Sequence, residues 1–123
     1  MNEKPQHLTD GKLAESLAEK YLIKQGLRLR EKNYRCRYGE IDLICDDKDS
    51  IVFIEVRYRK NACFGSAKES VNLHKQRKTI ITAKHYLISY PDKNCRFDVI
   101  ALSELNIKKI EWIKNAFDIS SLD

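Results

Sequence analysis

The spacing of apolar residues along the chain predicts two helices. Apolar positions recur at intervals of three and four over Thr9–Gln25, which is typical of a helix with one apolar face. Gly26 follows directly and is the residue type that often ends a helix. The same spacing over Lys68–Tyr90 predicts a second helix, which ends before Pro91.

The remaining segments have the alternating or β-branched character of strands. Leu27–Cys36 alternates apolar and cationic positions, and Arg59–Ala67, which contains Asn, Gly and Ser, reads as a loop. The four predicted strands after the first are Glu40–Cys45, Ser50–Tyr58, Arg96–Leu102 and Ile107–Ile113. The order is therefore α-β-β-β-α-β-β. It indicates an α/β fold with a mixed β-sheet flanked by helices, in which the second helix can connect two parallel strands.

Composition narrows the class of protein. The 123 residues, with 42% hydrophobic and 33% charged positions, fit one domain over residues 1–123, with a core over about 9–113. The longest uninterrupted apolar runs, such as Ile51–Ile54, are too short for a membrane span, so no membrane partner is expected. Met1–Gly11 lacks the apolar stretch of a secretory signal, and we expect a cytoplasmic protein. The four cysteines include no Cys-x-x-Cys pair, so neither a disulfide framework nor a closed zinc site is indicated.

The hairpin between the second and third strands predicts a cluster of charged groups. A two-residue turn at Lys48-Asp49 would place Asp42 directly opposite Glu55, and opposed residues point to the same face. Arg57 lies two residues beyond Glu55 and shares that face, about 6 to 7 Å away. A three-residue turn would break this pairing.

Two interpretations of this cluster stay open. Burial of two carboxylates together costs free energy unless a cation neutralises them, and Arg57 can be that cation in an ordinary ion-pair network. Alternatively, Asp42 and Glu55 hold Mg²⁺ or Mn²⁺, which prefer hard oxygen ligands. Glu15, at the edge of the first helix's apolar face, can either lean toward the sheet or simply complement the helix dipole.

The chain has a net charge of +5, and its cations gather in three segments. These are the first predicted strand with the turn after it, the end of the third predicted strand, and the second predicted helix. If these segments face one groove, they could grip phosphates, with tyrosines available to stack on bases; a solvated basic face is the competing interpretation. Gln76 shares the apolar stripe of the second helix, where its amide needs a partner. The candidate nucleic-acid-binding residues are Arg35, Arg37, Tyr58, Arg59, Lys60, Lys75 and Gln76.

Several separated motifs between Gly11 and Ile100 carry a resemblance to a known family. They are Gly11, Glu15, Tyr21-Leu22, Gly26, Asn33-Tyr34-Arg35, Gly39–Ile44, Val52–Arg59, Gly65-Ser66-Ala67, Lys75-Gln76, Ala83, Tyr86-Leu87 and Arg96–Ile100. Together they resemble the YraN family of small bacterial proteins. That family is similar to the restriction-endonuclease-like, or PD-(D/E)xK, nuclease superfamily, especially its Holliday-junction resolvases.

The resemblance implies a fold and a site. It implies a restriction-endonuclease-like α/β core, Asp42 and Glu55 as catalytic carboxylates, and Glu15 as the superfamily's helical acidic residue. Arg57 stands where the superfamily motif has lysine. Arginine stays protonated, so it can act there only as a hydrogen-bond donor and charge stabiliser. The resolvase relatives also imply a homodimer.

These observations lead to one hypothesis and two alternatives. The leading hypothesis is a metal-dependent endonuclease in which Glu15, Asp42 and Glu55 hold Mg²⁺ or Mn²⁺ and phosphodiester bonds in DNA are hydrolysed, with branched or junction DNA as a candidate substrate. The first alternative is a non-catalytic nucleic-acid-binding module on the same scaffold. The second is a protein-interaction domain whose acidic cluster is an ion-pair network held by Arg57.

Overall fold

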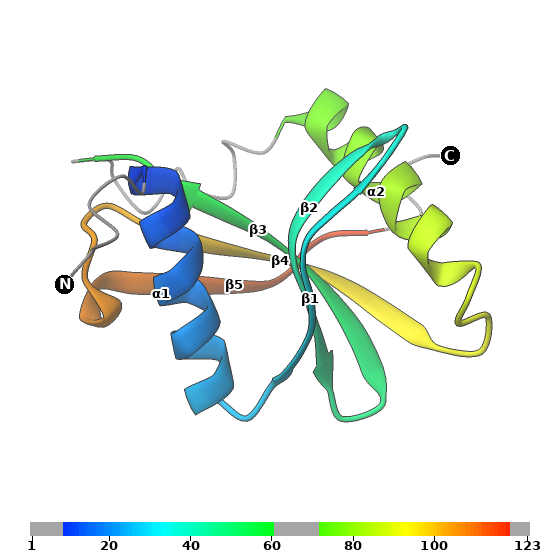
Figure 1. Cartoon of the computed structure of the whole chain (residues 1–123), viewed down its shortest axis with the longest axis horizontal. Coiled ribbons are helices and arrows are strands. Elements are labelled where there is room, and N and C mark those ends of the chain that lie inside the picture. Colours follow the sequence, from blue (N-terminus) through cyan, green and yellow to red (C-terminus); the bar gives the residue numbers. More distant parts are fainter. Residues whose placement is uncertain (1–8, 61–71, 119–123) are drawn as a thin grey trace, which may run out of the picture.

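The structure is a computed structural model that describes residues 9–60 and 72–118. Its elements follow the order predicted from the sequence, α-β-β-β-α-β-β, and this prediction is confirmed. Five strands form one mixed sheet in the order β1-β2-β3-β4-β5 (Figure 1). The elements are α1 (Asp10–Lys24), β1 (Arg28–Cys36), β2 (Gly39–Asp47), β3 (Ser50–Tyr58), α2 (Leu73–Leu87), β4 (Asn94–Leu102), a 3₁₀ helix η3 (Ile107–Lys109) and β5 (Ile110–Phe117).

Polar caps set the beginnings of both helices. The hydroxyl of Thr9 accepts the backbone N–H of Lys12 at 3.1 Å, and α1 begins at the next residue after this cap. The side chain of Asn72 accepts the backbone N–H of Lys75 at 2.9 Å, so the second helix begins later than the sequence prediction of Lys68. Positions 61–71, which include most of the predicted loop, lie outside the described residues.

The last predicted strand is displaced toward the C-terminus. The sequence prediction of a strand over Ile107–Ile113 is wrong for its first three residues, which form η3, while β5 continues to Phe117. The reason is a local cap, because the Asn106 side chain accepts the backbone N–H of Lys108 at 2.9 Å. A side-chain hydrogen bond of this kind competes with the strand ladder and delays the strand.

The two helices cover opposite faces of the sheet. Alternate residues of β3 point to opposite faces, so Val52 and Ile54 pack in the cluster that contains α1, whereas Ile51 and Phe53 pack in the cluster that contains α2. The helix residues buried in these clusters are Ala14, Ala18 and Leu22 of α1 and Ile80, Ala83 and Tyr86 of α2. No helix within residues 9–60 and 72–118 is long and apolar enough to cross a membrane.

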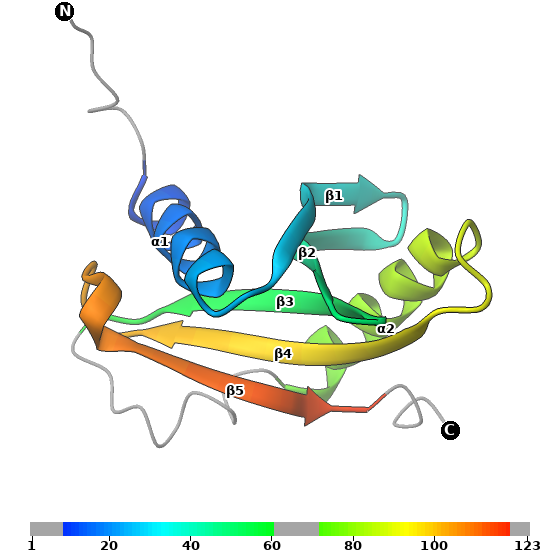
Figure 2. The same ribbon diagram turned by 90° about the horizontal axis from the view of Figure 1, so that it is seen from below.

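The β2–β3 hairpin has the predicted register and then opens. Lys48 and Asp49 form the two-residue turn between the paired residues Asp47 and Ser50, and Lys48 adopts a left-handed φ of +58°. The β2–β3 ladder ends at the pair Leu43–Ile54, although β2 continues its pairing with β1 as far as Gly39. In Figure 2 this end of the β1–β2 hairpin rises away from β3. The two strands therefore separate just beyond the pair Leu43–Ile54, at the position of Asp42 and Glu55.

Candidate functional site

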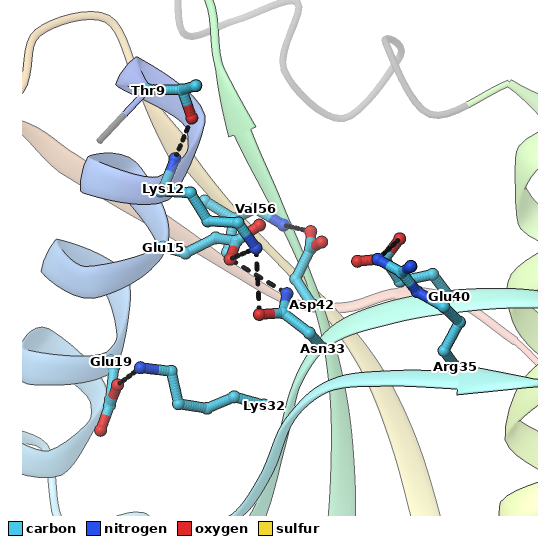
Figure 3. A network of polar contacts seen from close by, with 10 residues as sticks. All are labelled: Thr9, Lys12, Glu15, Glu19, Lys32, Asn33, Arg35, Glu40, Asp42 and Val56. Atoms are coloured by element: carbon cyan, nitrogen blue, oxygen red, sulfur yellow. Dashed lines mark hydrogen bonds and ion pairs between the residues drawn. The ribbon is translucent and has the colours of Figure 1, made fainter. Parts of the chain in front are cut away.

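Asp42 lies at the fork between β2 and β3. Its Oδ2 accepts a hydrogen bond from the backbone N–H of Val56 at 2.8 Å (Figure 3). Because the β2–β3 ladder ends at Leu43–Ile54, this side chain takes the place of a backbone carbonyl as the acceptor for a β3 donor. Burial and the neighbouring charge of Glu55 raise the pKa of Asp42 to about 7, with a smaller contribution from Glu15. The Val56 N–H and the Lys75 ammonium act in the opposite direction but do not offset these effects.

Glu55 is the buried member of the cluster, with 7% of its surface exposed. Two cations approach its Oε2. The ammonium of Lys75, from the start of α2, lies 3.4 Å away, and Nε of Arg57 lies 3.8 Å away. The sequence prediction that Glu55 and Arg57 share one face agrees with this contact. Lys75 joins the cluster from the helix side, and its cap at Asn72 fixes the helix start from which it reaches the sheet.

Glu15 leans from α1 toward the sheet, as one of the two sequence interpretations expected. Its side chain is 16% exposed, and its Oε1 accepts hydrogen bonds from Asn33 Nδ2 at 3.1 Å and Lys12 Nζ at 3.5 Å. Lys12 Nζ also donates to Asn33 Oδ1 at 3.1 Å, so the three side chains form a closed set beside Asp42 (Figure 3). Asn33 has a φ of +50°, a left-handed conformation that asparagine tolerates better than most residues.

The described residues 9–60 and 72–118 contain no group of three or more His, Cys, Asp or Glu side chains placed to hold a metal ion. The expected three-carboxylate set therefore stays a prediction. Asp42 and Glu55 have the hard oxygen donors that Mg²⁺ and Mn²⁺ prefer, and the charge of Glu55 raises the pKa of Asp42. Glu15 would join them only by exchanging its contacts with Lys12 and Asn33.

A basic pocket adjoins the carboxylates. It has a volume of about 530 Å³ and lies between the β1–β2 turn and the first half of α2. Lys75 belongs to both features, because it lines the pocket and reaches Glu55. Its lining includes four cationic side chains and one carboxylate, and we call this pocket the hairpin pocket. Its lining residues are Arg35, Cys36, Arg37, Tyr38, Gly39, Glu40, Lys75 and Lys78.

The structure brings together only some of the cations that the sequence analysis grouped. Arg35, Arg37 and Lys75 line the hairpin pocket, whereas Arg59 and Lys60 follow the end of β3 on the exposed surface. Arg59 donates to its neighbour's carbonyl oxygen at 3.1 Å. Two further members of the proposed nucleic-acid-binding set are partly buried: Tyr58 packs against the core on the α1 side, and Gln76 lies within α2.

Two cations of β1 are engaged in ion pairs away from the hairpin pocket. Arg30 Nη1 donates to both carboxylate oxygens of Asp46, at 2.8 and 3.0 Å, and Arg30 Nε donates to the hydroxyl of Tyr86 at 3.0 Å. Lys32 pairs with Glu19 at 3.0 Å (Figure 3). Arg30 and Lys32 therefore have partners elsewhere in the fold, whereas Arg35 lines the hairpin pocket.

Sequence reasoning gave no role to a buried carboxylate at Asp98, which is fully enclosed. Asp98 accepts hydrogen bonds from the guanidinium of Arg96 at 3.0 Å, from Trp112 Nε1 at 2.9 Å and from the backbone N–H of Asn115 at 2.9 Å. The β4–β5 register shifts between Phe97 and Val99, beside this carboxylate. The Arg-x-Asp spacing in a strand is the one signal that could have suggested the ion pair.

Comparison with known proteins places the chain in a family. The model of the family described as uncharacterised protein family UPF0102 matches residues 14–102. A UPF0102 protein from Methylobacillus flagellatus is 52% identical over 104 residues, which is 85% of this chain and 92% of the relative. A UPF0102 protein from Psychromonas ingrahamii is 56% identical over 108 residues, 87% of this chain and 88% of the relative. The chain belongs to the UPF0102 family, and the resemblance to the YraN family is confirmed.

A solved structure is also similar. A repair endonuclease from Pyrococcus abyssi matches 89% of this chain and 43% of its own length, with 21% sequence identity and a TM-score of 0.46. A similarity at this level says nothing about activity.

Proposed function

We propose that the chain is a divalent-metal-dependent nuclease that hydrolyses phosphodiester bonds in DNA at the Asp42–Glu55 site. One observation carries the proposal: two carboxylates at a strand fork adjoin a pocket lined by four cations. The charge of Glu55 raises the pKa of Asp42, and a divalent cation between the two carboxylates would offset their repulsion. The neighbouring cations suit the phosphates of a nucleic acid.

The residues divide into ligands and phosphate contacts. Asp42 and Glu55 would hold Mg²⁺ or Mn²⁺, with Glu15 as a further ligand. When bound, the metal would lower the pKa of a water molecule and stabilise charge on the phosphoryl oxygens. Lys75 would position the scissile phosphate, because its ammonium is already directed to the carboxylates while it lines the hairpin pocket.

Arg57 sets a limit on this chemistry. Its guanidinium lies 3.8 Å from Glu55 and stays protonated at all relevant pH values, so it cannot accept the proton of the attacking water. We assign it charge stabilisation of the phosphoryl oxygens instead. Proton removal from the water would then depend on the metal.

The test is calorimetric titration of Mn²⁺ into the wild type, Asp42→Asn and Glu55→Gln, followed by a Mn²⁺-dependent cleavage assay on branched and linear DNA. We expect both variants to lose Mn²⁺ binding and cleavage while they remain folded and retain most DNA binding. Glu31→Gln, which changes an exposed carboxylate of β1, is the matched control and should behave as wild type. Cleavage that survives in both variants would exclude this site.

One observation favours a second candidate function, a non-catalytic nucleic-acid-binding module. Glu55 already has two cations near its Oε2, Lys75 and Arg57, and these can satisfy the carboxylate without a metal. Under this alternative, purified protein binds DNA with a steep salt dependence, and added Mn²⁺ produces neither a calorimetric signal nor cleavage.

A further inference from the structure

The hairpin pocket combines phosphate-binding groups with an exposed aromatic ring. Tyr38, in the turn between β1 and β2, is 42% exposed, and the Arg37 guanidinium lies 5.2 Å from the centre of its ring. Arg37, Lys75 and Lys78 offer positive charge in the same pocket. A nucleotide needs these two kinds of group, a cation for its phosphate and an aromatic surface for its base.

The pocket has a fixed shape because the hairpin turn rests on α2. A Cβ atom added to Gly39 would lie 2.9 Å from the Thr82 hydroxyl oxygen, so the backbone of the turn and the helix are in close contact there. A second tie joins the same two elements, since Tyr34 Oη lies 2.7 Å from His85 Nδ1. Walls held in this way require little ordering when a ligand binds.

The charge balance of the pocket favours an anion. Four of the eight lining residues are cationic and one, Glu40, is anionic. Glu40 lies 3.4 Å from Arg35, whose side chain is 72% exposed, and pairs of this exposure are weak and screened by salt. The volume of about 530 Å³ falls in the range of pockets that bind small molecules.

We propose that the hairpin pocket binds one unpaired nucleotide of a nucleic-acid strand, with the base on Tyr38 and the phosphate among Arg37, Lys75 and Lys78. This inference rests on the proposed function, because it takes the same face to be a nucleic-acid surface, and it narrows the substrate to strands with a single-stranded segment. Bases inside a duplex are stacked and paired, so only an unpaired base can lie on the ring. Lys75 connects the pocket to Glu55, and the bound nucleotide therefore adjoins the carboxylates.

The experiment measures fluorescence anisotropy with a fluorescein-labelled oligo(dT) strand and a blunt duplex of equal length, in the presence of EDTA to prevent cleavage. We expect the wild type to prefer the single strand. Tyr38→Leu keeps an apolar side chain but removes the ring, and it should weaken single-strand binding by about tenfold or more while changing duplex binding little. Tyr38→Phe, which keeps the ring, should bind as wild type.

Charge is tested separately from stacking. Lys78→Gln should weaken both probes, whereas Lys20→Gln, on the exposed surface of α1, should weaken neither. Unlabelled dTMP distinguishes a strand from a free mononucleotide as the ligand. Displacement of the labelled strand by dTMP at concentrations close to those of the strand itself would overturn the proposal that a strand is bound.

The outcomes separate this inference from the proposed nuclease activity. Single-strand preference that depends on Tyr38, together with no Mn²⁺-dependent cleavage, supports the inference and contradicts the nuclease. Mn²⁺-dependent cleavage with equal affinity of Tyr38→Leu and wild type for the single strand contradicts the inference and supports the nuclease. Absence of binding to both probes contradicts the inference.

Discussion

The ammonium of Lys75 in α2 lies 3.4 Å from a carboxylate oxygen of Glu55 in β3, so a helix on one face of the sheet supplies the countercharge of a buried acid. Lys75 is placed by the cap of its helix, because its own backbone N–H is donated to the Asn72 side chain at 2.9 Å. The same lysine lines the hairpin pocket. Local helix capping thus connects the acidic cluster to the basic surface.

Replacement of Lys75 by glutamine should change the titration of a different residue. Lys75 lowers the pKa of Asp42, so Lys75→Gln should raise the pKa of Asp42 further from its usual range. Because the Lys75 side chain is 41% exposed, we expect a loss of only about 0.5 to 1 kcal/mol in the free energy of unfolding. The measurement is an NMR titration of the Asp42 carboxyl carbon, with Lys20→Gln as the control. An unchanged midpoint would contradict the prediction.

The stability of the wild type should fall as the pH rises from about 4 to about 7. Asp42 keeps its proton up to about pH 7 in the folded state but releases it near pH 4 when unfolded, so the folded state binds more protons in this range. Asp42→Asn keeps an oxygen for the Val56 N–H and cannot ionise. At pH 8 and in the absence of metal, the free energy of unfolding of Asp42→Asn should exceed that of the wild type by about 2 to 4 kcal/mol.

Urea unfolding at pH 5 and pH 8 checks the Asp42 prediction. The gain from Asp42→Asn should be less than half as large at pH 5 as at pH 8, because pH 5 lies only about one unit above the unfolded pKa of Asp42, whereas the exposed control Glu31→Gln should show no such pattern. Saturating Mn²⁺ should reduce the difference at pH 8 if the wild-type carboxylate binds the ion, because a ligand that binds only the folded state stabilises it. Equal gains at both pH values would contradict the assigned pKa.

Gly39→Ala should destabilise the junction between the hairpin and α2. The φ of +156° is unfavourable for alanine, and the added Cβ would lie 2.9 Å from the Thr82 hydroxyl. We expect a loss of about 1 to 3 kcal/mol in the free energy of unfolding. The double variant with Thr82→Ala should lose less than the sum of the two single variants, because the steric conflict is then absent. Additive losses would show that the close approach is unimportant.

Asp98 should be far more sensitive than its hydrogen-bond partner Trp112. Asp98→Ala removes the acceptor of the Trp112 and Asn115 donors and leaves the Arg96 guanidinium with Asp47 as its carboxylate partner, and we expect a loss of about 3 to 5 kcal/mol. Trp112→Phe removes one donor and part of an apolar ring, and should cost about 1 to 3 kcal/mol. Thermal unfolding followed by circular dichroism compares the two. A smaller loss for Asp98→Ala would contradict the assigned role.

The sequence predicted the element order and the register of the β2–β3 hairpin, which the structure shows as far as the pair Leu43–Ile54, for a local reason. A two-residue turn at Lys48-Asp49 determines the register of the β2–β3 hairpin, and alternation along the strand then places Arg57 with Glu55. These relationships depend on neighbouring residues only. The family resemblance independently selected the same three positions.

Long-range contacts explain what the sequence did not predict. The start of β5 depends on the Asn106 cap, and its register shift lies beside Asp98 in another strand. The hairpin pocket forms because the end of the β1–β2 hairpin leaves β3 and rests on α2. The bulge between Leu29 and Glu31 disturbs the alternation along β1, so the sequence alone did not show that Arg35 lines this pocket while Arg30 pairs with Asp46.

The strand order also suggests a sequence in which Asp42, Glu55 and Lys75 come together during folding. Each strand of the sheet pairs with its neighbour in the chain, and β1, β2 and β3 form two successive hairpins that need only short loop closures. The parallel β3–β4 pairing requires the longer connection through α2. We therefore expect Asp42 and Glu55 to come together in early, local structure and Lys75 to reach them when the crossover closes. A nascent chain that has formed only the hairpins holds both acids without the α2 countercharge.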